Sequence, residues 1–129
     1  TALAGRFRDP LFRFGRLFGG MPYDDGLAHR VRTILESRGD INERSMFGGV
    51  GYMLNGNLVC GIHDDALIAR VGPDAYTDAL AETHAREMDF TGKPMRGLVF
   101  VDPPGTATDE ALEAWLDRCL DFVGSLPPK

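Results

Sequence analysis

The dipeptide Asn55-Gly56 constrains the fold of this chain more than any other feature of its sequence. It separates two apolar runs, residues 50–54 and 58–63, and both of its residues readily adopt the positive φ angles of a two-residue hairpin turn. Asp64-Asp65 is a weaker turn of the same length, and it leads into a third apolar run at residues 66–71. The sequence therefore predicts a meander of three antiparallel strands.

The lengths of these two turns set the register of the meander, and the register decides which side chains share a face. A two-residue loop at 55–56 pairs Met53 with Leu58, and Tyr52 with Val59. One face is then wholly apolar and is expected to meet the helices; it carries Met53, Leu58, Cys60, Ile62, Leu67, Ala69 and Val71. The opposite face is mixed and carries Val50, Tyr52, Val59, His63, Ile68 and Arg70.

The mixed face is the surface on which we expect a protein partner to bind. Its candidate contact residues are Tyr52, Val59, His63 and Arg70, since aromatic residues and arginine are enriched at interfaces. An ordinary sheet face that is half exposed to water is the alternative, because antiparallel sheets commonly alternate in this way.

Three helices and two further strands complete the predicted fold. Asp24-Asp25 begins the first helix, Gly72-Pro73-Asp74 opens the second, and Thr108 caps the last. Strands are expected at residues 86–90 and 95–101. The prediction is an α+β two-layer sandwich over residues 21–129, with an antiparallel sheet of about five strands, helices on one face, and the order α-βββ-α-ββ-α.

Residues 1–20 differ from the rest of the chain in charge and pattern. They hold four arginines against one aspartate, a net charge of +3, whereas residues 21–129 hold 10 basic and 18 acidic side chains, a net charge of −8. Apolar residues recur here at helical spacing, so a short amphipathic helix is expected, and we interpret the segment as a leader outside the domain. Docking on an anionic membrane or on a partner is the alternative. The acidic body disfavours nucleic-acid binding, which would have to depend on this leader.

The cysteines, histidines and glycines give no catalytic or metal-binding pattern. Cys60 and Cys119 fall at core positions, which favours structural thiols in a reduced, cytoplasmic protein without a membrane span, and no cofactor is expected. No histidine lies in a metal-ligand motif, and no nucleophile, dinucleotide or phosphate-loop motif is present, so we expect no enzyme. Two loops remain as candidates near a ligand, and they contain Phe47, Gly48, Gly49 and Lys93.

Several short segments, in their order along the chain, resemble the TfoX/Sxy N-terminal domain family. They include Met46-Phe47-Gly48-Gly49, Asn55-Gly56-Asn57, Arg70-Val71-Gly72-Pro73 and the stretch from Met88 to Met95. The resemblance covers residues 21–128 and implies a two-layer fold similar to that of secretion chaperones. It also implies a link to the regulation of competence genes, but it supplies no catalytic residue.

The sequence leaves three classes of function open. The leading hypothesis is a protein-interaction module, accessory to the regulation of transcription or competence. The alternatives are a small-molecule-binding domain or an enzyme of unfamiliar type, and direct nucleic-acid binding through residues 1–20. A monomer and a homodimer fit the sequence equally well.

Overall fold

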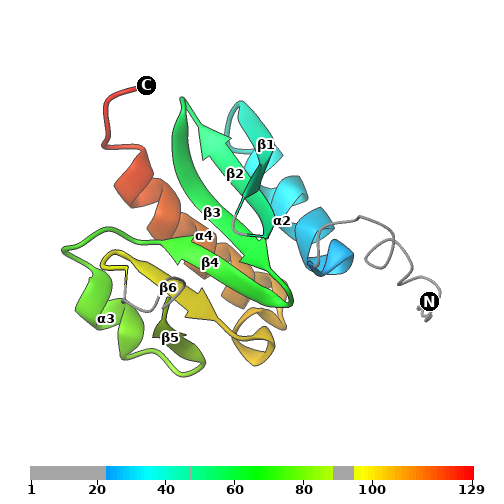
Figure 1. Ribbon diagram of the computed structural model, residues 1–129, viewed down its shortest axis with the longest axis vertical. Helices are drawn as coiled ribbons and strands as arrows, with labels where there is room; N and C mark the ends of the chain where they lie inside the picture. The colour runs from blue at the N-terminus through cyan, green and yellow to red at the C-terminus, as the bar shows by residue number, and fades with distance from the viewer. Residues whose placement is uncertain (1–22, 47, 89–94) are drawn as a thin grey trace.

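The computed structural model describes residues 23–46, 48–88 and 95–129. They form one six-stranded antiparallel sheet in the order β1-β2-β3-β4-β6-β5, with α2 and α4 on the same face (Figure 1). The elements are α2 (Asp25–Glu36), β1 (Ile41–Met46), β2 (Gly49–Leu54), β3 (Asn57–His63), β4 (Ala66–Arg70), α3 (Tyr76–Leu80), β5 (Ala85–Glu87), β6 (Leu98–Val101), the 3-10 helix η1 (Pro103–Thr106) and α4 (Asp109–Val123). The predicted α+β fold is confirmed, with one strand more than expected.

Both predicted hairpin turns are confirmed. Asn55 and Gly56 have φ angles of 54° and 83°, and the residues that flank them, Leu54 and Asn57, pair directly. Asp64 has a φ of 57°, and the second turn pairs His63 with Ala66. The register of β3 against β4 is the predicted one, with Ile62 opposite Leu67 and Cys60 opposite Ala69.

The predicted register of β2 against β3 is wrong beyond the first pairs, because β3 contains a bulge. Met53 lies opposite Leu58 as predicted, but Tyr52 lies opposite Cys60, so Val59 is an extra residue on β3. One extra residue exchanges the faces of every later pair. Tyr52 therefore points to the helix side of the sheet, and Met53 and Leu58 fall outside the main core.

The main core lies between the sheet and the helices. Leu27, Val31 and Leu35 line the buried face of α2, and a similar stripe on α4 runs from Leu112 to Val123. Side-chain caps begin both helices, because Asp24 accepts a hydrogen bond from the Leu27 amide and Thr108 accepts one from the Ala111 amide. A second, smaller cluster covers part of the opposite sheet face and contains Ala66, Ile68, Met88 and Phe100.

β1 was not predicted as a strand. Its four central side chains are exposed and only its end residues, Ile41 and Met46, are partly buried, so its sequence lacks the alternation of a half-buried strand. The last two predicted strands, β5 and β6, are shorter than expected. β5 ends at Glu87 and β6 begins at Leu98, and residues 89–94 between them are outside the described ranges.

Candidate functional site

A cleft of about 350 Å3 opens between α4, η1 and the segment that joins α3 to β5. These elements lie far apart in the sequence and meet only in the folded chain. Nine residues line the cleft, namely Glu82, Thr83, His84, Pro104, Gly105, Ala111, Ala114, Trp115 and Arg118.

α4 supplies one wall of the cleft. Its four lining residues, Ala111, Ala114, Trp115 and Arg118, recur at helical spacing and so share one face of the helix. Trp115 is only 7% exposed and belongs to the main core as well. The Arg118 guanidinium carbon lies 5.0 Å from the centre of the Trp115 ring, a cation-π contact that restrains the arginine.

The opposite wall is tightly packed around His84. This residue has a φ of 75°, a backbone conformation that residues other than glycine rarely adopt. Its carbonyl accepts a hydrogen bond of 2.9 Å from the Asp102 amide. A Cβ atom on Gly105 would lie 3.1 Å from the His84 Cβ and 2.6 Å from Val101 Cγ1. Glycine at position 105 therefore allows η1 to pack closely against His84.

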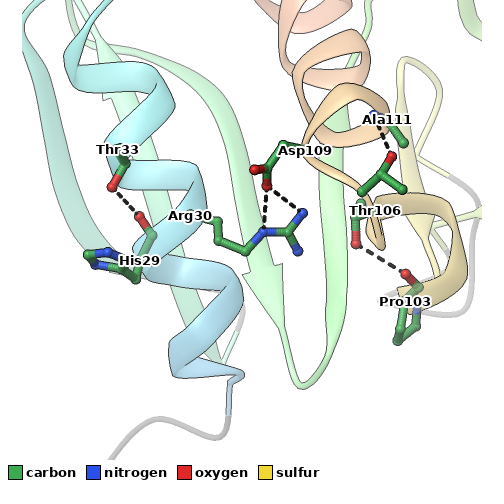
Figure 2. Close-up of polar contacts among 8 residues, drawn as sticks. His29, Arg30, Thr33, Pro103, Thr106, Asp109 and Ala111 are labelled. Carbon is green, nitrogen blue, oxygen red and sulfur yellow. Dashed lines mark hydrogen bonds and ion pairs between the residues drawn. The ribbon is translucent and has the colours of Figure 1, made fainter.

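Hydrogen bonds at the start of α4 hold η1 and the helix in place (Figure 2). The Thr106 hydroxyl donates to the Pro103 carbonyl over 3.4 Å, and the Ala111 amide donates to the Thr108 hydroxyl over 3.1 Å. The Arg30 guanidinium of α2 binds the Asp109 carboxylate at 3.2 Å (Figure 2). The first two contacts order η1 and the first turn of α4, and the third links α4 to α2.

The polar groups of the cleft are suited to binding a charged or hydrogen-bonding group. Arg118 and Glu82 form an ion pair across the opening, and Thr83 and His84 are exposed beside them.

Within residues 23–46, 48–88 and 95–129, no group of three or more histidine, cysteine or acidic side chains could hold a metal ion. No helix of those same ranges is long and apolar enough to cross a membrane.

The predicted interaction residues do not form one exposed surface. Tyr52 and Val59 are fully buried in the main core as a result of the bulge, so their expected exposure is wrong. The Tyr52 hydroxyl donates a hydrogen bond of 3.3 Å to the Ala28 carbonyl of α2, and burial, with a smaller effect of the nearby Glu43 carboxylate, raises the pKa of Tyr52 well above its usual value.

The other two predicted interaction residues are partly exposed. His63 lies on the far face of the sheet, with its ring centre 6.0 Å from that of Phe100. Arg70 donates to the Leu58 carbonyl over 3.2 Å, and its guanidinium lies 5.4 Å from the Phe122 ring of α4. Each side chain thus has an intramolecular contact of its own.

The predicted ligand loops do not contribute to the cleft as far as they are described. Gly48 and Gly49 lie at the β1–β2 turn, and neither lines the cleft. A Cβ on Gly49 would lie 1.9 Å from the Ile62 carbonyl oxygen, so close packing of the two strands explains the glycine at this position. Phe47 and Lys93 lie outside the described residues, as does the helix expected within residues 1–20.

The two cysteines are buried in the main core, as predicted. Burial raises the pKa of the Cys119 thiol to about 12, and burial together with the nearby Cys119 raises that of Cys60. The cleft itself was missed, although Ala111, Ala114, Trp115 and Arg118 gave a signal: they form a second helical stripe beside the core stripe of α4.

The fold and the cleft define a small two-layer α+β domain with a concave site at the helix side of one sheet end. The chain belongs to the TfoX N-terminal domain family, whose model matches residues 33–123. No curated protein and no solved structure gave a match to the chain.

Proposed function

We propose that this chain is a protein-interaction module of TfoX N-terminal type, accessory to the regulation of transcription or competence, and that it contacts its partner over the cleft. The observation that carries the proposal is the restrained pair of Arg118 and Trp115 in a concave, partly exposed surface. Arginine is one of the residue types most enriched among those that dominate binding energy at interfaces, and the buried Trp115 ring restrains the arginine here. Family membership supports a regulatory role.

Charge supports a protein partner over a nucleic acid. Residues 21–129 carry a net charge of −8, which repels phosphate backbones. Direct nucleic-acid binding through the arginines of residues 1–20 stays a prediction, because that segment lies outside the described residues.

A substitution that fills the cleft tests the proposal. Ala114 is exposed and lies on the α4 wall, so Ala114→Arg blocks the cleft without changing the core. We expect Ala114→Arg to lower recovery of specific partners in affinity capture at least about tenfold, the loss typical of a central interface residue. The matched control is Thr33→Arg, which adds the same charge at an exposed position of α2 (Figure 2). Equal recovery with both variants would contradict the proposed surface.

A small-molecule site is the second candidate, and the size of the cleft favours it. Its volume of about 350 Å3 lies at the lower end of the range that small-molecule pockets occupy. A thermal-shift screen against metabolites tests it, since a specific ligand raises the melting temperature of the protein that binds it. The shift should be lost in Ala114→Arg and retained in Thr33→Arg.

A further inference from the structure

The cleft already holds one carboxylate, and it belongs to the chain itself. Glu82 Oε2 lies 2.5 Å from Arg118 Nη2. Both side chains are partly exposed, 48% for Glu82 and 35% for Arg118, so water and solutes reach this pair. An exposed pair of this kind contributes little to stability and is readily exchanged.

The guanidinium of Arg118 is presented as a fixed binding group. Trp115 lies beneath it, and the contact with Glu82 is made through Nη2, whereas a guanidinium offers five N–H donors in a planar fork. That fork matches the two oxygens of a carboxylate. A carboxylate from outside the chain can therefore compete with Glu82 for Arg118, and it can use donors of the fork other than the Nη2 that Glu82 contacts.

The rest of the cleft suits a small apolar group attached to such a carboxylate. Ala111, Ala114, Pro104 and Gly105 give a lining of small or compact side chains next to the Trp115 ring. The exposed imidazole of His84 lies in the same lining and offers a further hydrogen-bonding group.

Charge limits the ligand to a single negative charge at this position. Arg118 is the only charged residue among the four that α4 contributes to the cleft. The acidic residues Asp109 and Asp117 pair with Arg30 of α2 and with Arg38, which follows α2, on another side of α4. Arg118 is the only arginine or lysine among the nine lining residues, and the displaced Glu82 carboxylate stays nearby, so a phosphate dianion would leave more uncompensated negative charge in this acidic domain than a monocarboxylate.

We infer that the cleft binds the carboxylate of a monocarboxylic acid with a small apolar substituent, and that this carboxylate replaces Glu82 on Arg118. The inference rests on the proposed use of the cleft and names the chemistry that it recognises. Two sources share this chemistry: a free small acid, and the terminal carboxylate of a protein partner.

Trp115 makes the test direct, because it is the only tryptophan in the chain and lines the cleft. The full chain is titrated with sodium propionate at constant ionic strength while tryptophan fluorescence is recorded, and propionamide is the neutral control. A saturable change is expected with propionate and none with propionamide. N-acetyl-trialanine with a free or an amidated C-terminus forms the second arm; saturation by the free peptide alone assigns a protein terminus, and saturation by propionate alone assigns a small acid.

Two substitutions give opposite expected effects. Glu82→Gln removes the internal competitor and should tighten carboxylate binding about 1.5- to 5-fold, the range that corresponds to an exposed ion pair. Arg118→Gln should weaken binding at least about tenfold. Arg38→Gln, an arginine paired with α4 outside the cleft, is the control and should leave binding unchanged.

The inference is overturned if neither wild type nor Glu82→Gln shows a saturable response to either carboxylate, or if Arg118→Gln, with an unaltered circular dichroism spectrum, responds like wild type. The proposed function fails separately. If Ala114→Arg loses its partner while the titrations stay flat, the cleft is the interface but does not recognise a carboxylate.

Discussion

At the scale of single residues, two buried tyrosines differ in one hydrogen bond. The Tyr52 hydroxyl donates to the Ala28 carbonyl, whereas the Tyr76 hydroxyl is buried without a hydrogen-bond partner in the described structure. Burial raises the pKa of both phenols. A buried hydroxyl stabilises a fold when it is paired and costs free energy when it is not.

Replacing each tyrosine by phenylalanine should therefore change the free energy of unfolding in different ways. We expect Tyr52→Phe to lower the free energy of unfolding by about 1 kcal/mol, and Tyr76→Phe to leave it unchanged or raise it slightly. Urea denaturation of the two variants beside wild type measures both. A larger loss of unfolding free energy in Tyr76→Phe than in Tyr52→Phe would contradict the hydrogen bonding described for these residues.

At the scale of elements, the C-terminal residues are attached to the tip of the β2–β3 hairpin. The Lys129 amide donates to the Asn55 carbonyl over 2.8 Å, and the buried Asn57 side chain donates to the Pro127 carbonyl over 3.0 Å. Figure 1 shows the C-terminus beside this end of the sheet. The segment after α4 thus restrains the hairpin.

Asn57→Ala tests this attachment. Loss of its hydrogen bond should destabilise the fold by about 1 kcal/mol and speed hydrogen exchange at the Lys129 amide. Asn42→Ala, at an exposed position of β1, is the control. Unchanged exchange at Lys129 in Asn57→Ala would show that the side chain does not hold the segment.

The hairpin turn was predictable because a two-residue turn has a specific sequence requirement, which Asn55-Gly56 meets. The bulge at Val59 was not, because no glycine or proline marks it, and it alone moved Tyr52 from the predicted surface into the core. β1 was missed because its central residues are exposed. The cleft was out of reach for another reason: His84, Gly105 and Arg118 come from three separate segments that only tertiary packing brings together.

At the scale of the whole molecule, the buried thiols couple stability to pH. The pKa of Cys119 rises from 9.0 to about 12 on folding, and that of Cys60 also rises. The unfolded chain therefore releases these protons at a lower pH than the folded chain, so their contribution to stability is complete below about pH 8 and is lost as pH rises above about 9.

Urea denaturation between pH 7 and pH 10 should show this loss. The free energy of unfolding should fall with a slope that approaches about 1.4 kcal/mol per pH unit for each thiol. The double variant Cys60→Ala, Cys119→Ala should have a shallower slope over this range, whatever its stability at pH 7. An equal slope in both proteins would show that the thiols are not responsible.

The exposed outer strand β1 has a consequence for aggregation. A twofold axis that joins two antiparallel copies of β1 edge to edge must place a residue opposite its own counterpart. At the centre of the strand that residue is Glu43 or Arg44, so like charges would face each other. Central charges of this kind disfavour symmetric pairing of two sheets through β1, the outer strand of the described sheet.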